Sequence, residues 1–341
     1  MTASSHPNPR QKAPTELSSL FLLLKDHFQT LDQFLSDQVL AFEPEIRDIA
    51  AYCLENGGKR IRSALVFFSG WEEGPLSPGL VRLAAVIEMV HLATLVHDDI
   101  MDKADLRRNR ATVAKKFGPD TAVLLGDALF SQAVHLATDF PSNEVCRYVS
   151  KSTRRVCSGE IMQTLRDKEL NSNIESYRRI IDLKTAELFF VSCYLGARLT
   201  PFPSEYADAA GSFGRHLGTA YQMYDDLTDF FGNEEIIGKT LGTDLVSGKQ
   251  TLPLLMFTER VGSEKSEQAR RNILNGEPDA IQQIAHQMTD LGIFEEMARI
   301  TEKEIFLATE ALSPFKDLPP STQLLKIADI LRNQIKALKS E

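Results

Sequence analysis

Residues 80 to 102, LVRLAAVIEMVHLATLVHDDIMD, constrain the fold of this chain more than any other segment. Apolar residues cover almost every face of this segment up to its acidic C-terminal turn, which predicts a central helix that is buried all round. Elsewhere apolar residues recur at helical intervals, and no proline falls between Pro141 and Pro201 or between Pro203 and Pro253. The sequence therefore predicts an all-α protein in which a buried helix ends in carboxylates.

Length and composition narrow the classes of protein further. A chain of 341 residues allows one large helical domain or two smaller ones. The net charge of −9 argues against a general nucleic-acid binder, because nucleic-acid phosphates are bound chiefly by clustered Lys and Arg. The four cysteines form no CxxC pair, so we expect thiols in a reducing compartment and no zinc site.

The first residues, MTASSHPNPRQKAP, lack the apolar stretch of a secretory signal. No run of the chain approaches the about 18 apolar residues of a membrane-spanning helix. We therefore expect a cytoplasmic protein without a transmembrane segment. Because the opening is polar and contains three prolines, residues 1–15 are expected to form a disordered tail before a domain spanning 16–341. A transit peptide is the weaker alternative.

Two acidic clusters follow apolar helical segments and share one spacing. The first cluster ends the segment described above, the second lies in YQMYDDLTDFFG, and their members are Asp98, Asp99 and Asp102, and Asp225, Asp226 and Asp229. Residues i and i+4 lie on one helix face about 6 Å apart, so the outer members of each cluster repel each other. A solvated acidic face would explain one such cluster, but two of identical spacing favour a functional site.

The residue types in these clusters indicate a magnesium site. Carboxylates without neighbouring His or Cys form a hard oxygen site that suits Mg²⁺, which is commonly shared with substrate phosphates. Six carboxylates would repel a diphosphate of about −3, whereas three divalent ions bring the sum back to about −3, which nearby Lys and Arg can neutralise. No GxGxxG fingerprint or P-loop is present, so nucleotide binding by those routes is disfavoured.

Motifs between about residues 50 and 255 resemble the trans-isoprenyl diphosphate synthases, or polyprenyl synthetases, most of all the long-chain, octaprenyl-type members. In the family's order they are GGKRIR, HDDIMD with its following RR, GD, GE, KTA, YQMYDDLTD and GKTLGTDLVSGKQTLP. Asn109 stands where the family usually has Gly, and Tyr221 where Phe is common. The resemblance implies the isoprenoid synthase fold, a single-domain bundle of long helices around a deep central cavity, and a homodimer.

The resemblance also implies a role for each acidic residue and for several cations. Three Mg²⁺ ions would hold an allylic diphosphate between the clusters, with Asp98, Asp102 and Asp225 as direct ligands. The remaining carboxylates, Asp99, Asp226 and Asp229, would complete the metal sites directly or through water. The same diphosphate would contact Arg107, Lys184, Lys239 and Lys249, supported by Thr185 and Gln222. Isopentenyl diphosphate would be held without metal by Gly58, Lys59, Arg62, His91 and Arg108.

The reaction implied is head-to-tail prenyl transfer. Metal-assisted departure of diphosphate leaves an allylic carbocation, the double bond of isopentenyl diphosphate attacks it, and a proton is lost. Lys184, Thr185 and Gln222 would stabilise the cation. Terpene cyclases and head-to-head synthases share the first motif, but cyclases generally carry an Asn/Ser/Glu motif at the second, and neither needs GGKRIR. A non-catalytic partner subunit would be expected to have lost the aspartates.

Product length in the family is limited by residues beneath the first acidic cluster. Ala93 and Thr94 are small, where short-chain relatives often carry an aromatic ring. We therefore expect six to eight isoprene units, with octaprenyl favoured and farnesyl or geranylgeranyl diphosphate as alternatives. The deeper positions expected to stop the product are Val86, Met89, Val90, Phe130 and Val134. Residues 260–341 carry little functional signal, and 325–341 predict a terminal amphipathic packing helix.

Overall fold

The computed structural model describes residues 16–55, 58–71, 75–166, 173–232, 241–242, 244, 249–277 and 279–338. The expected tail, 1–15, and Lys239 lie outside these residues. The α-helices are α1 (Glu16–Phe21), α2 (Lys25–Gln38), α3 (Arg47–Leu54), α4 (Ile61–Ser69), α5 (Pro78–Met101), α6 (Val113–Phe117), α7 (Pro119–Thr138), α8 (Glu144–Arg166), α9 (Ile174–Ile181), α10 (Glu187–Arg198), α11 (Ser204–Phe231), α14 (Leu252–Val261), α15 (Ser263–Leu274), α16 (Ala280–Asp290), α17 (Ile293–Ala311) and α18 (Pro319–Leu338). Short 3₁₀ turns are η1 (Leu22–Leu24), η2 (Val39–Ala41), η3 (Pro44–Ile46) and η5 (Ser313–Phe315), and η4 (Asp182–Ala186) is a π-helical turn. The all-α prediction is confirmed.

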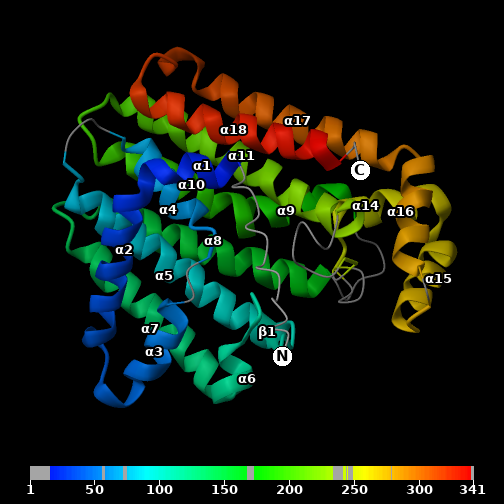
Figure 1. The fold of residues 1–341 in the computed structure, drawn as a ribbon, viewed down its shortest axis with the longest axis horizontal. Coiled ribbons are helices and arrows are strands. Elements are labelled where there is room, and N and C mark those ends of the chain that lie inside the picture. The colour runs from blue at the N-terminus through cyan, green and yellow to red at the C-terminus, as the bar shows by residue number, and fades with distance from the viewer. Residues whose placement is uncertain are drawn as a thin grey trace, which may run out of the picture.

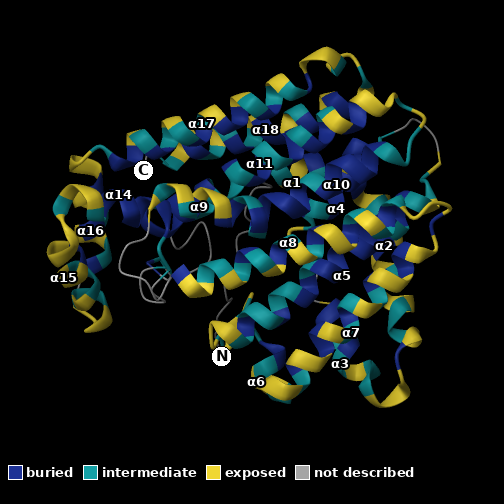
Figure 2. Cartoon of the chain, turned by 180° about the vertical axis from the view of Figure 1, so that it is seen from behind, coloured by how far each residue is buried: buried dark blue, intermediate teal, exposed yellow. Residues whose placement is uncertain are grey.

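Helix α5 lies at the centre of the bundle, as predicted. It begins at Pro78, a residue favoured in the first helical turn because its missing N–H would have no partner there. It packs against α4 and α7, and α10 packs between α4 and α11 (Figure 1). Among the described residues, α5 alone is long and apolar enough to span a membrane, but most of that apolar stretch is buried by other helices (Figure 2).

Two apolar clusters hold the helices together. The larger extends from α1 to α18 and contains fully buried aromatic residues such as Phe67, Phe189 and Tyr206. The smaller joins the end of α11 to α14, α16 and the start of α17. Helix α18 buries one face, with Leu324, Ala328, Leu331 and Ile335, so the predicted amphipathic packing helix is confirmed over Pro319–Leu338. Helices α15 and α16 lie at one end of the molecule, beside α14 (Figure 1).

A small hairpin follows α5 and carries the paired arginines. Strands β1 (Leu106–Arg107) and β2 (Arg110–Ala111) pair antiparallel. Both turn residues between them, Arg108 and Asn109, have positive φ, 52° and 61°, as a type I′ turn requires. Asn tolerates this left-handed conformation better than most residues. The departure from the family's Gly at position 109 therefore preserves the turn.

Candidate active site

The candidate site is a hollow between α5, α7, α8, η4 and α11. A cavity of about 490 Å³ is lined by Asp98 at the end of α5, by Lys184 and Thr185 of η4, and by Gln222 of α11. A second hollow of about 190 Å³ is also lined by Lys184, Thr185 and Gln222, and in addition by Asp225. The two acidic helix ends therefore open on adjoining hollows, as the shared spacing of the clusters suggested.

The outer carboxylates of the first cluster face cations. Lys184 Nζ lies 3.7 Å from Asp98 Oδ2, and Lys249 Nζ lies 2.8 Å from Asp102 Oδ2. Burial raises the pKa of Asp98 to about 6, because Lys184 only partly offsets the desolvation and Glu160 and Asp102 add negative charge. Asp98 lines the cavity and Asp102 is exposed beside it, and both are paired with lysines that a substrate phosphate could attract away.

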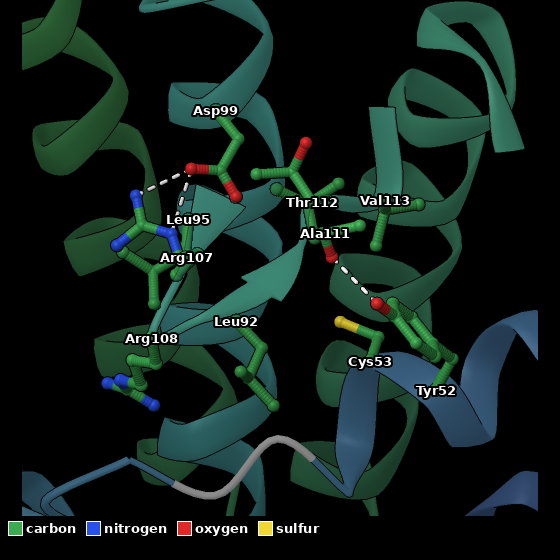
Figure 3. A pocket seen from close by; sticks show the side chains of 11 residues that line it. Tyr52, Cys53, Leu92, Leu95, Asp99, Arg107, Arg108, Ala111, Thr112 and Val113 are labelled. Atoms are coloured by element: carbon green, nitrogen blue, oxygen red, sulfur yellow. Dashed lines mark hydrogen bonds and ion pairs between the residues drawn. The ribbon is translucent and has the colours of Figure 1, made fainter. Parts of the chain in front are cut away.

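The inner carboxylate, Asp99, turns away from the cavity. It is buried, and its Oδ1 accepts hydrogen bonds from Arg107 Nε at 2.8 Å and Nη2 at 2.7 Å (Figure 3). The hairpin that carries Arg107 is fastened to α3, because Tyr52 Oη donates to the Ala111 carbonyl at 2.7 Å. Asp99 thus fixes the hairpin to the end of α5, and the paired arginines with it.

The second cluster divides in the same way. Asp225 is partly exposed, whereas Asp226 is buried. Asp226 accepts hydrogen bonds from Tyr177 Oη at 2.6 Å and Gln222 Nε2 at 2.9 Å. Burial, with a further contribution from the charge of nearby Asp244, raises the pKa of Asp226 to about 8. The inner carboxylate of this cluster is therefore held by neutral donors.

Asp229, the last member of the second cluster, is fully buried and anchors the segment that follows α11. Its Oδ2 accepts from the Asp244 backbone N–H at 3.0 Å, and its carbonyl accepts from the Gly242 N–H at 2.8 Å. Of the six carboxylates, Asp98 lines the large cavity, Asp225 and the buried Asp226 line the smaller hollow, and Asp102 is exposed at the end of α5. Within the described ranges, no three His, Cys, Asp or Glu side chains lie close enough to hold a metal ion by themselves.

The π-helical turn η4 aims two polar side chains into the cavity. Lys184 Nζ pairs with Glu160 Oε2 at 2.5 Å and donates to Gln163 Oε1 at 3.1 Å. Thr185 Oγ1 donates to Gln222 Oε1 at 2.8 Å. The sequence alone assigns no role to Glu160 or Gln163, although the GE motif and its helical spacing to Gln163 are a usable signal.

A cationic group lies where α4, α5 and the hairpin meet, and two of its members, Arg62 and His91, line the same large cavity as Asp98. Arg62 Nη1 lies 3.1 Å from His91 Nε2, and because a guanidinium can only donate, the ring nitrogen accepts. Burial lowers the pKa of His91 well below its usual 6.5, and Arg62 lowers it further. His91 is therefore a neutral ring that orients Arg62. It does not add the positive charge that a basic set would suggest.

Gly58 makes room for Arg108. A Cβ at position 58 would lie 2.1 Å from Arg108 Nη2, so any side chain there would displace the guanidinium. Lys59 is exposed beside them. Figure 3 shows Arg107 directed to Asp99 and Arg108 directed away from it, as expected for two arginines that serve different groups.

The residues assigned to chain length separate into two sets. Thr94 and Phe130 line the large cavity, together with His97. Val134 is 36% exposed on α7. Four of the assigned residues are packed in the apolar core and do not line this cavity: Val86, Met89, Val90 and Ala93.

Comparisons with known proteins identify the family of this chain. The polyprenyl synthetase family pattern matches residues 43–290. The chain is 33% identical over 301 residues to the octaprenyl diphosphate synthase of Escherichia coli, covering 88% of this chain and 92% of that one. It is 30% identical over 306 residues to the all-trans-nonaprenyl-diphosphate synthase of Rhodobacter capsulatus, and the match covers 89% of this chain and 93% of that one.

A solved structure has the same fold. The Caulobacter crescentus polyprenyl synthase, complexed with calcium and isoprenyl diphosphate, superposes with a TM-score of 0.83 at 28% identity, over 94% of this chain and 99% of that one. The helical bundle, the paired acidic helix ends and the sequence match agree with one another. The chain therefore belongs to the polyprenyl synthetase family.

Proposed function

We propose that this enzyme joins isopentenyl diphosphate head to tail to an allylic diphosphate and makes a long-chain polyprenyl diphosphate, with octaprenyl favoured. The observation that carries the proposal is the placement of carboxylates and cations around one cavity. Asp98 and Asp225 line adjoining hollows, and Asp102 is exposed at the end of α5. A cationic group that includes Arg62 and Arg108 lies at α4 and the hairpin, and Arg62 lines the same large cavity as Asp98. Such an arrangement provides one diphosphate site that requires metal and one that does not.

The open carboxylates fit divalent metal. Their donors are all carboxylate oxygens, which suit Mg²⁺. The pKa of Asp98 is raised chiefly by burial and further by the charges of Glu160 and Asp102, so a nearby divalent cation would favour its ionised form. Because too few of these side chains converge to hold an ion unaided, the substrate diphosphate would supply the remaining ligands. The calcium and isoprenyl diphosphate in the Caulobacter crescentus structure support this use of metal. We propose three Mg²⁺ ions, which would stabilise charge on the departing diphosphate.

The side chains of the cavity complete the proposed chemistry. Lys184 and Lys249, now paired with carboxylates, would move to the allylic diphosphate once metal neutralises Asp98 and Asp102. Thr185 and Gln222, already joined by a hydrogen bond, would present their dipoles to the allylic cation. The cation would be attacked by the double bond of isopentenyl diphosphate, and the departed diphosphate would take the proton.

Isopentenyl diphosphate would bind at the cationic group. Arg62 and Arg108 supply charge there, Lys59 adds an exposed ammonium, and Gly58 allows close approach. Desolvation by burial lowers the pKa of Arg62, so a bound anion would stabilise its charged form. Arg107 belongs to the allylic side, because Asp99 holds it towards the end of α5.

The assembly and location proposed for the enzyme rest on its surface and its thiols. Large apolar side chains are exposed on α7 and α8, among them Leu124 at 68% and Ile161 at 61%, which supports a homodimer formed through these helices. The four cysteines are free, which supports the cytoplasm as the location. Residues 16–341 are proposed to act as one prenyl synthase domain.

Product sizing tests the function directly. Purified enzyme would be incubated with labelled isopentenyl diphosphate, Mg²⁺ and geranyl, farnesyl or geranylgeranyl diphosphate in turn, with EDTA as the metal-free control. We expect polyprenyl diphosphates of six to eight units and no elongation in EDTA. Cyclic hydrocarbons or the absence of elongation would refute prenyl elongation, whereas a product of three or four units would refute only the assigned length.

A further inference from the structure

The junction of α9 and α10 is built as a π-helical turn, η4. A π turn is closed by i→i+5 hydrogen bonds, is wider than an α-helical turn and occurs frequently at functional sites. Lys184 and Thr185, the residues of this turn that line the cavity, owe their direction to it. Anything that holds the turn in its π form therefore also holds these two side chains.

Two glycines of neighbouring helices make room for the wide turn. A Cβ at Gly159 of α8 would lie 2.9 Å from both Leu183 Cβ and the Lys184 backbone nitrogen. A Cβ at Gly218 of α11 would lie 2.8 Å from Ala186 Cα. The turn η4 therefore packs closely against α8 on one side and α11 on the other, and the two glycines leave the space that it occupies.

The same two helices also bind the ends of the turn by charge. Arg155 of α8 donates from Nη2 to Asp182 Oδ2 at 2.9 Å and from Nε to Glu187 Oε2 at 2.7 Å. Arg215 of α11 donates from Nη2 to Glu187 Oε2 at 2.8 Å and from Nη1 to Asp182 Oδ1. Ser152 adds a hydrogen bond of 2.9 Å to Glu187 Oε1. The four charged side chains close a ring.

The four ring residues can contact one another when the turn is π-helical, but they could not if the same residues were α-helical. Asp182 and Glu187 are five residues apart, which places them about 140° apart around an α-helix of 3.6 residues per turn. An i→i+5 turn brings them to the same side, where each arginine can reach both carboxylates. The ring therefore favours the π form over the α form of the same residues.

Burial strengthens the ring. The Glu187 side chain is 2% exposed, and although burial acts to raise the pKa of Glu187, hydrogen bonds from Arg215 and Arg155 outweigh it and lower that pKa. Neither arginine and neither carboxylate of the ring lines the cavity or the adjoining hollow. These residues therefore cannot act by touching a substrate there.

We propose that Arg155, Asp182, Glu187 and Arg215 are positioning residues that lock η4 as a π turn and so fix Lys184 and Thr185 for the chemical step. The inference rests on the proposed prenyl transfer for its kinetic consequence. Its structural consequence, a rigid turn at 183–187, stands independently of what the enzyme makes.

Asp182→Asn tests the ring with least risk to the fold, because Asp182 is the most exposed of the four and Glu187 keeps both arginines paired. We expect kcat to fall about tenfold to a hundredfold, since small misplacement of reacting groups costs up to about a hundredfold. The KM for isopentenyl diphosphate should stay within about twofold, because the residues proposed to hold it belong to α4, α5 and the hairpin and not to η4. Hydrogen exchange of residues 183–187 should rise.

A double-mutant cycle separates positioning from general damage. In a background that carries both Lys184→Ala and Thr185→Ala, Asp182→Asn should lower kcat by less than about threefold, because the two side chains that the ring positions are already gone. Losses that multiply would overturn the inference, as would an Asp182→Asn enzyme with normal kcat. If Asp182→Asn fails to fold, Arg215→Lys carries the same test, since an ammonium keeps the charge but cannot bridge two carboxylates as a planar guanidinium does.

Glu144→Gln is the matched control. Glu144 and Arg198 form a doubly hydrogen-bonded pair between α8 and α10, at 3.1 Å for each contact, at the other end of α10 from the turn. We expect its loss to leave kcat and exchange at 183–187 unchanged. Failure of the wild-type enzyme to elongate would refute the proposed function alone, whereas unchanged exchange in Asp182→Asn would refute the ring alone.

Discussion

The ends of α5 and α11 carry the same acidic spacing but are neutralised by different means. At α5 the inner carboxylate, Asp99, is paired with the guanidinium of Arg107. At α11 the inner carboxylate, Asp226, accepts hydrogen bonds from two neutral groups, the Tyr177 hydroxyl and the Gln222 amide. One cluster is thus balanced by a protein cation, and the other retains a proton or requires an external cation.

The difference indicates how the site is prepared for substrate. Two lysines, Lys184 and Lys249, approach the carboxylates of the first cluster, one from η4 and one from the segment after α11. The cations of the site therefore come from outside the clusters and can follow a diphosphate when it arrives. Metal and substrate would then replace cross-cavity ion pairs that already hold the two sides in register.

Removing an open carboxylate from either cluster should produce the largest effect. We expect Asp98→Asn or Asp225→Asn to lower kcat by about three or more powers of ten while the fold is retained, because each would lose a metal ligand. Steady-state elongation assays at saturating Mg²⁺ measure this. Asp105→Asn is the matched control, since Asp105 is exposed and pairs with Lys115 outside the cavity.

Near-wild-type turnover of either variant would contradict the metal assignment. A large loss of kcat for Asp98→Asn with a small loss for Asp225→Asn would show that the two clusters do not hold equivalent metals, despite their common spacing.

The cationic group should behave differently from both clusters. Arg62→Ala is expected to raise the KM for isopentenyl diphosphate about tenfold to a hundredfold, and Lys59→Ala less, because Arg62 is desolvated and Lys59 is exposed. The allylic KM should change by less than about threefold. Varying each substrate in turn measures both constants.

Arg60→Ala is the control within the same motif. Arg60 pairs with Asp32 at 2.8 Å and with Glu88 at 3.3 Å, so its loss should reduce stability and leave both KM values unchanged. Equal increases in both KM values for Arg62→Ala would show that the two diphosphate sites are not separate.

The sequence predicted the parts of this site that depend on local spacing. The i, i+4 pattern placed Asp98 and Asp102 together, and the apolar faces predicted α5 as a buried helix. The sequence did not predict that Asp99 binds Arg107, because that contact depends on a hairpin turn formed by Arg108 and Asn109. The π turn carries no sequence signature, since its i→i+5 register is selected by Arg155 and Arg215 from distant helices.

The pH dependence of metal-free stability should distinguish the two clusters. The pKa of Asp226 is raised from 3.8 to about 8 and that of Asp98 from 3.8 to about 6, in both cases chiefly by burial. The folded protein therefore keeps protons that the unfolded chain releases, and its unfolding free energy should fall as pH rises above about 4. Each group contributes a slope of at most about 1.4 kcal/mol per pH unit.

Denaturant unfolding in EDTA between pH 5 and pH 8 measures these slopes. Asp98→Asn should remove the part of the fall below about pH 6, and Asp226→Asn the part that extends to about pH 8. An upper slope that persists in Asp226→Asn would contradict the view that burial and the charge of Asp244 hold Asp226 protonated.

The smallest effect on rate is expected just beneath the clusters, where their equivalent positions differ in size. Thr94 lies four residues before Asp98, and Tyr221 lies four residues before Asp225; both line the cavity. Thr94 is small and donates its hydroxyl to the His91 carbonyl at 2.7 Å, whereas the Tyr221 ring packs 5.5 Å from that of Phe189. The opening for a growing chain is therefore wider on the α5 side.

Thr94→Tyr would give both clusters the same large side chain at this position. Because residue 94 lies about 6 Å below Asp98, at 1.5 Å per residue, the ring should block the chain without reaching the reacting atoms. We expect the product to shorten to about three or four units with first-step turnover changed less than about threefold.

Ala93→Phe tests the neighbouring position, which is packed in the core, where overpacking costs about 1–3 kcal/mol of stability. Sizing the products of the two variants shows which position borders the growing prenyl chain. A product shortened by Ala93→Phe but not by Thr94→Tyr would mean that the prenyl chain passes the other face of α5.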